Sequence, residues 1–240
     1  MNNIKNVVKL DEKTIKQIEK KLFGFHKSLD AFREVAKNFE AEIQKSPESI
    51  RFLAENGWYL PFDLHILTIN HYAQLVKSGK IEAADNELIK YINSEIESIK
   101  IELIEKYPHR ASIIKSAIEA HKRRDYYLSI PVFFSQIEGI CKEVTGIRFF
   151  KLNKNKPATA SWAETFQTDS IISILLEPLK INGITRKLQI ANSPVGLNRH
   201  DILHGESCDY GESEVNSYKA LSLLNYIGLT VDQIKKFGLK

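Results

Sequence analysis

One short stretch near the C-terminal end gathers residues that could do chemistry. From Asn198 to Glu206 the chain reads Asn-Arg-His-Asp-Ile-Leu-His-Gly-Glu, and Asp209 and Tyr210 follow. The stretch holds two of the seven histidines of the chain. Arginine donates two parallel hydrogen bonds to phosphate oxygens, and imidazole exchanges protons near neutral pH. We therefore take this stretch as the main candidate for a catalytic or binding site.

Helical spacing predicts how these side chains are directed. At 100° per residue, Ile202 and Leu203 define a buried side, and Arg199 lies between them in angle. A guanidinium on a buried side must be paired, or it must face a cleft or a subunit interface. Gly205 is expected to end the helix and to leave His204 in its last turn. Arg199 and His204 share no face of one ideal helix, so they would converge at the helix end or across two chains.

One interpretation of the stretch is a zinc site. His200 and His204 are four residues apart, as two zinc ligands on a helix would be, and Glu206 or Asp209 could be a third ligand. The residue after the first histidine is Asp201, however, where the metalloprotease motif has a glutamate as its general base.

Two other interpretations need no metal. In a structural one, Arg199 pairs with a buried acid such as Glu138, and the histidines satisfy local hydrogen bonds. In a catalytic one, Arg199 holds the phosphate of a nucleic acid and a histidine transfers protons. The residues by themselves leave all three interpretations open.

The run from Arg199 to His204 resembles the R-x4-6-H motif of HEPN domains, helical bundles in which a polar residue, here His200, follows the arginine. The context is similar as well, because the motif lies late in the chain, at a helix end and before one more long helix. A polar cluster, residues 135–138, interrupts an apolar helix upstream. The tail, residues 209–226, also resembles that of uncharacterised bacterial proteins with such domains. The resemblance covers roughly residues 108–237.

This resemblance implies a reaction and its setting. Many HEPN proteins are metal-independent endoribonucleases of toxin–antitoxin, CRISPR and abortive-infection systems. They need no cofactor, and two copies form one composite cleft. A ribose 2′-OH attacks the adjacent phosphate and leaves a 2′,3′-cyclic phosphate and a 5′-OH. Arg199 would stabilise the charge of the transition state, and His204 would act as general base or acid beside its twin.

The resemblance also implies supporting residues and partners. Asn198, His200 and Asp201 would orient the phosphate or the catalytic pair, and Glu138 or Gln136 would hold Arg199. The expected partners are RNA, with tRNA as one candidate, a second copy of the chain, and a neutralising or activating protein. The family also has inactive members that only bind RNA or proteins, which makes a non-catalytic helical module the alternative. Basic residues that could contact the RNA backbone are Lys122, Arg123, Arg124, Lys151, Lys154 and Lys156.

Composition is that of an ordinary soluble protein. Of 240 residues, 43% are hydrophobic and 27% charged, which excludes a disordered chain or a low-complexity fibre. Cys141 and Cys208 make no disulfide framework, and both are expected to be small buried residues. No apolar run nears the roughly 18 residues of a membrane helix, and the start of the chain has no signal-peptide stretch. We expect a cytoplasmic protein without membrane contact.

Charge is uneven along the chain. Residues 1–107 carry 16 basic and 17 acidic side chains, whereas residues 108–240 carry 18 basic and 13 acidic ones. The net charge of +5 in the second part is consistent with a polyanionic partner.

A heptad pattern opens the chain and predicts a helix from about Asp11 to Lys45. Such a helix could form a dimeric coiled coil or pack on its own chain, and three phenylalanines in the seam favour the second. Ser46-Pro47-Glu48 predicts the start of a new helix, which Asn56-Gly57 ends. The seam consists of Ile15, Leu22, Leu29, Ala36 and Ile43 in one series and Ile18, Phe25, Phe32 and Phe39 in the other.

The rest of the chain also shows helical periodicity, and we find no convincing strand pair. The expected fold is an all-α multi-helix bundle. A boundary near Tyr107-Pro108 would separate an N-terminal helical region, 1–107, from a HEPN-like helical domain, 108–240. The predicted helices are 63–77, 81–106, 110–122, 126–144, 170–180 and about 213–237.

Overall fold

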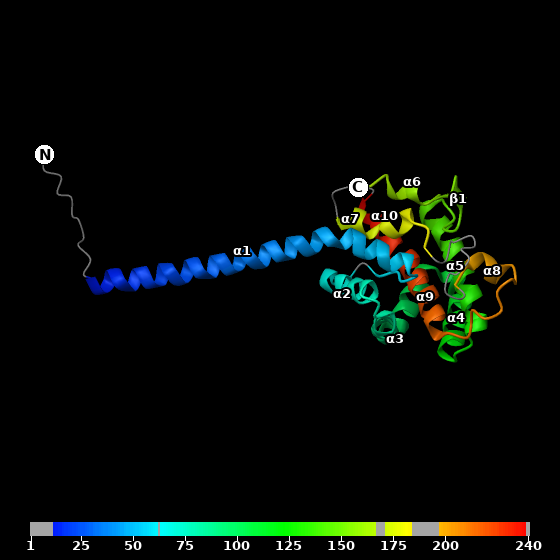
Figure 1. Ribbon diagram of the computed structural model, residues 1–240. Coiled ribbons are helices and arrows are strands. Elements are labelled where there is room, and N and C mark those ends of the chain that lie inside the picture. Colours follow the sequence, from blue (N-terminus) through cyan, green and yellow to red (C-terminus); the bar gives the residue numbers. More distant parts are fainter. Residues whose placement is uncertain (1–11, 62, 167–170, 184–196, 239–240) are drawn as a thin grey trace. The chain divides into compact units, whose positions relative to one another are not determined.

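The computed structural model describes residues 12–61, 63–166, 171–183 and 197–238 (Figure 1). The chain divides into two compact units, residues 1–44 and residues 45–240. The predicted boundary near Tyr107-Pro108 therefore falls inside the second unit.

A single long helix, α1 (Glu12–Glu55), makes up the described part of the first unit and continues into the second. The heptad helix is confirmed over its described residues, whereas Asp11 and the side chains of Ile15, Ile18, Leu22 and Phe25 lie outside them.

The predicted helix start at Ser46-Pro47 is wrong, because Pro47 lies inside α1. Proline in a helix interior costs about 3 kcal/mol, since it removes one hydrogen bond and crowds the preceding turn. The turns after it bury Ile50, Leu53 and Ala54 in the core. Burial of a large aliphatic side chain is worth about 1.5–3 kcal/mol, which offsets the cost of the proline.

The second unit is a helical bundle, and the all-α prediction is confirmed. The helix 170–180 is split in two, and its Ser170 lies outside the described residues. The elements after α1 are α2 (Ile66–Lys77), α3 (Ile81–Lys106), η1 (Pro108–Arg110), α4 (Ala111–Lys122), α5 (Tyr126–Thr145), α6 (Ala160–Ala163), α7 (Ile171–Leu175), η2 (Glu177–Lys180), α8 (Arg199–Leu203), α9 (Glu214–Asn225), the π-helical turn η3 (Tyr226–Val231) and α10 (Asp232–Gly238).

Helix α5 is the centre of the bundle. It packs against α4, α9 and η3, and the short α8 lies beside it (Figure 1). Ile130, Phe133 and Ile137 are fully buried, as expected for a helix with apolar residues on several faces. Gly146 ends the helix with a φ of +78°, a left-handed conformation that glycine adopts without strain.

One core joins both sides of Tyr107-Pro108. Helix α3 packs against α4 and α9, and the hydroxyl of Tyr107 donates a 2.9 Å hydrogen bond to the carbonyl of Gly228. Trp58 and Tyr59, in the turn after α1, are also buried in this core. The second unit is thus a single packed body from its first turn onward.

A small hairpin corrects the expectation that the chain has no strand pair. Strand β1 (Leu152–Asn153) pairs antiparallel with β2 (Lys156–Pro157). The two turn residues, Lys154 and Asn155, have φ values of 49° and 65°, as in a type I′ turn. Strands of two residues are too short to show alternation, and lysine replaces the usual first turn residue, so the sequence pattern missed the hairpin.

The two cysteines differ in burial. Cys141 is buried on α5, as predicted, but Cys208 is exposed, and the prediction that it is buried is wrong. Cys208 lies in the loop between α8 and α9, and the residues directly beside it in the sequence are polar, so the loop stays at the surface. Among the helices described, none is long and apolar enough to cross a bilayer.

Candidate functional site

Local interactions fix both ends of the motif helix, α8. At its start, the side-chain oxygen of Asn198 accepts a 2.9 Å hydrogen bond from the backbone N–H of His200. At its end, Gly205 has a φ of +76°, and the N–H of Glu206 donates to the carbonyl of Asp201 at 2.8 Å. The predicted end of the helix at Gly205 is confirmed.

Arg199 is half-buried and lies on an aromatic ring. Its guanidinium carbon is 5.3 Å from the ring centroid of Phe150, within the range of a cation–π contact. Its Nε is buried and has no hydrogen-bond partner in the part of the chain that the structure describes. Ile202, one turn further on, is buried as predicted, but Leu203 is 38% exposed. The helix is so short that only its Ile202 side faces the bundle.

The two residues expected to hold Arg199 bond to other groups. The carboxylate of Glu138 accepts a 3.1 Å hydrogen bond from the backbone N–H of Phe150. The amide oxygen of Gln136 accepts one of 2.9 Å from Nη1 of Arg110. Glu138 therefore anchors the backbone of Phe150, the residue whose ring lies beneath the guanidinium.

The two histidines of the motif form an exposed pair. The ring centroids of His200 and His204 are 4.3 Å apart, with an angle of 50° between the ring planes. Asp201, between them, has a buried Oδ1 without a hydrogen-bond partner among the described residues. The proposed catalytic residues thus have different neighbours: Phe150 for Arg199 and the ring of His200 for His204.

The zinc interpretation needs a third ligand beside the histidine pair. Within the described residues, no three His, Cys, Asp or Glu side chains are placed to hold one metal ion. Asp209, one of the candidate third ligands, instead accepts a 2.9 Å hydrogen bond from the hydroxyl of Ser207.

The basic residues fall into two groups. Lys151, Lys154 and Lys156 are exposed on and beside the hairpin, which directly follows Phe150. The contact of Phe150 with Arg199 therefore connects this group to the motif.

The second basic group occupies the turn between α4 and α5. Lys122 pairs with Glu97 at 2.6 Å, and Arg123 pairs with Asp125 at 3.4 Å. Arg124 is exposed, with a φ of 66°. Two of these three charges are already compensated by acids.

Phe150 is the site residue that the sequence analysis missed. It stands in the run Arg148-Phe-Phe-Lys151, and an aromatic residue directly before a lysine-rich loop was the available signal. The loop after α8 is also held by an unpredicted pair, because the hydroxyl of Tyr210 donates to the carbonyl of Tyr127 at 3.0 Å.

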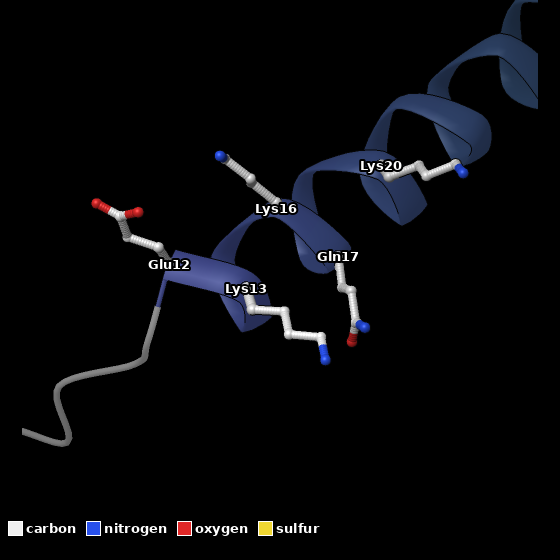
Figure 2. A pocket seen from close by; sticks show the side chains of 5 residues that line it. All are labelled: Glu12, Lys13, Lys16, Gln17 and Lys20. Carbon is white, nitrogen blue, oxygen red and sulfur yellow. The ribbon is translucent and has the colours of Figure 1, made fainter.

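A lysine-rich hollow at the start of α1 does not form a comparable site. All of its lining residues come from this one helix, and Figure 2 shows Glu12 and Lys16 extending away from Lys13 and Gln17. The side chains diverge, so they offer no common point to a ligand.

No known protein family model, curated protein or solved structure matches this chain.

Proposed function

We propose that the protein is a metal-independent endoribonuclease of the HEPN type, acting in phage defence or a toxin-like stress response. The observation that carries the proposal is the state of Arg199. Its guanidinium is held over Phe150, and its buried Nε has no partner among the described residues. A planar guanidinium fixed by stacking keeps its other donors for two oxygens of an anion such as phosphate.

The proposed reaction uses this arginine together with two imidazoles. The 2′-oxygen of a ribose attacks the adjacent phosphorus, the bond from phosphorus to the 5′-oxygen breaks, and a 2′,3′-cyclic phosphate remains. One imidazole takes the proton of the 2′-OH and another protonates the leaving 5′-oxygen. Arg199 stabilises the additional negative charge on the phosphate oxygens. The exposed His204 supplies one imidazole, and His204 of a second copy supplies the other.

Two further features support an RNA substrate. The lysines of the hairpin lie next in sequence to Phe150 and offer positive charge to the backbone beside the scissile phosphate. The chemistry itself requires a 2′-OH and therefore selects RNA over DNA.

The test is a cleavage assay on total RNA and tRNA with EDTA present. We expect the wild type to give cyclic-phosphate ends. Arg199→Ala should lose at least 100-fold in rate because it removes a donor that stabilises the transition-state charge, and His204→Ala should lose as much because it removes a general acid–base group. Arg33→Ala and His71→Ala, at exposed positions on α1 and α2, are the matched controls and should keep full activity.

Several outcomes would contradict this function. Equal cleavage by wild type and both motif variants would place the activity elsewhere. Loss of cleavage in EDTA, with recovery on zinc addition, would favour the hydrolase that uses His200 and His204. Cleavage of a substrate with 2′-deoxyribose at the scissile position would exclude attack by the 2′-oxygen.

A second candidate function, a non-catalytic interaction module, rests on α1. Described by itself, this helix has large apolar residues at its surface. The exposed fractions are 69% for Phe32, 65% for Val35 and 46% for Phe39. Phe32 and Phe39 belong to the heptad seam, and exposed apolar side chains in such a pattern are typical of a helix that binds another helix.

A further inference from the structure

A second hollow lies away from the motif, between α3 and the π-helical turn η3. Its volume is about 200 Å³. None of its lining residues belongs to α5, α8 or the hairpin, so it is separate from the site of Arg199. The lining consists of Pro61, Asp63, Tyr91, Glu95, Ser98, Ile99, Glu102, Asn225, Leu229, Thr230 and Gln233.

The charge of this pocket is negative and uncompensated. Asp63, Glu95 and Glu102 are its charged lining residues, and no ion pair of these three is found within the described chain. Burial, followed by the charges of Asp63 and Glu95, raises the pKa of Tyr91 to about 12. Both carboxylates therefore act on the same phenol, and the pocket favours a cation.

The floor of the pocket carries an unusual amide. The side chain of Asn225 is 7% exposed, lines the pocket, and makes no hydrogen bond to another described residue. Its polar atoms are not among the fully buried, unpartnered atoms of the described residues, so they reach the space of the pocket that Asn225 lines. The unpaired amide is independent of the carboxylates at the rim and points to a ligand with hydrogen-bonding groups.

Two kinds of helix form the facing walls of the pocket, the α-helix α3 and the π-helical turn η3. Tyr91, Glu95, Ser98 and Glu102 recur every three or four residues and form one face of α3, beside its buried stripe. On the facing wall, the wider π turn with its i→i+5 hydrogen bonds follows Asn225 directly. Such turns occur often at functional sites in proteins.

We propose that this pocket binds a linear aliphatic polyamine. Glu95 and Glu102 are two helical turns apart, about 10 Å along α3, which suits ammonium groups separated by methylene chains. Pro61, Ile99 and Leu229 offer apolar surface to those methylenes. The amide oxygen of Asn225 accepts an N–H of the ligand and thereby gains the partner that it lacks.

A polyamine fits better than a metal ion. The three carboxylates are spread around the pocket, and in the described part of the chain they form no three-ligand group for a metal. A ligand with several separated positive charges can reach all of them at once. The inference does not depend on the proposed ribonuclease activity.

Titration calorimetry of the full-length protein with spermidine tests the inference. We expect saturable binding of one spermidine per chain, and about tenfold weaker binding in Glu95→Gln and Glu102→Gln. Both positions lie at the rim and keep their size, so these variants should fold, which circular dichroism checks. Glu105→Gln is the matched control, because Glu105 is exposed on the same helix but does not line the pocket.

The floor of the pocket provides a separate check. Asn225→Asp adds a carboxylate at the buried position and should tighten spermidine binding in protein that remains folded. Absence of saturable binding up to millimolar spermidine would overturn the inference. An equal loss of affinity in Glu105→Gln, or displacement of spermidine by an equal concentration of Mg²⁺, would show only general attraction to acidic surface and would also overturn it.

Discussion

The guanidinium of Arg199 lies over the ring of Phe150, with its central carbon 5.3 Å from the ring centroid. The backbone N–H of Phe150 in turn donates to the carboxylate of Glu138 on α5. Glu138 thus anchors the residue beneath the arginine and is not itself paired with the arginine among the described residues. An arginine paired directly with a carboxylate would have to break that pair to bind phosphate, whereas a stacked one does not.

Replacement of Phe150 should therefore affect activity more than folding. In Phe150→Leu the ring under Arg199 is lost, and a cation–π contact of about 1–2 kcal/mol corresponds to a loss of roughly tenfold in the rate of RNA cleavage. Phe150→Tyr keeps the ring and should keep the rate. Single-turnover cleavage measures this rate, and a thermal melt reports stability. Equal rates in the leucine and tyrosine variants would separate Phe150 from the site.

The sequence predicted the elements of the site better than their contacts. Asn198 and Gly205 carry strong local signals for a helix start and a helix end, and both bound α8 as expected. The neighbours of Arg199 depend on which residue of a distant segment meets it. The identity of Phe150 is set by the path of the chain after α5, and no spacing within the motif encodes that path.

The same distinction explains the errors in the fold. Pro47 is a strong local signal for a helix start, but burial of the following turns kept α1 continuous. Leu203 was assigned to the core on angle alone, and a helix as short as α8 buries only one narrow side. The long helices α3 and α5, whose apolar stripes span many turns, were predicted nearly to the residue.

Acid should destabilise the protein through His121. Burial lowers the pKa of this histidine to about 4 from an ordinary value of 6.5. Between these values the unfolded chain binds a proton that the folded protein does not, so stability falls as the pH drops from about 6.5 to about 4. The full loss is about 3 kcal/mol. Urea unfolding at pH 7, 6 and 5 measures it.

A histidine variant isolates this contribution. His121 Nδ1 lies 2.7 Å from the hydroxyl of Ser217, which is 2.9 Å from that of Ser129. His121→Phe removes the titrating ring and leaves the hydroxyl of Ser217 bonded to Ser129. The variant should be less stable at pH 7 but lose less stability on going to pH 5. The same pH dependence in both proteins would refute the assignment.

A side chain at Gly228 should destabilise the protein, because the π-helical turn η3 packs closely against α3 at this position. A Cβ there would collide with Cδ2 of Leu103, which is fully buried on α3. Gly228→Ala should destabilise the protein by about 1–3 kcal/mol, the usual cost of overpacking a core. The free energy of unfolding in urea measures the loss. Leu103→Val in the same chain should recover part of it, and a strictly additive double variant would contradict this contact.

The exposed seam of α1 should mediate association. Phe32→Glu places a charge in the heptad seam and should shift any oligomer toward monomer in sedimentation velocity. Lys37→Glu changes the charge by two units at an exposed position outside the seam and is the control. Identical sedimentation of the wild type and Phe32→Glu would exclude the seam as an interface between copies. Loss of RNA cleavage together with the oligomer would connect α1 to the composite site.

The hairpin lysines should carry more of the RNA affinity than the basic turn between α4 and α5. No ion pair of Lys151, Lys154 or Lys156 is found among the described residues, whereas Lys122 is already paired with Glu97. Each lysine that contacts a phosphate of single-stranded RNA contributes about 0.7 to the slope of log affinity against log salt. Alanine at all three hairpin positions should therefore reduce the slope by about 2.

Fluorescence anisotropy with a non-cleavable RNA, whose 2′-oxygens are blocked, separates this binding from catalysis. Lys122→Ala is the matched control and should leave the slope nearly unchanged, because the ammonium group of Lys122 is already paired with the carboxylate of Glu97. A larger effect of Lys122→Ala than of the triple variant would place the RNA at the turn between α4 and α5. The hairpin would then not be the surface that binds the RNA backbone beside Arg199.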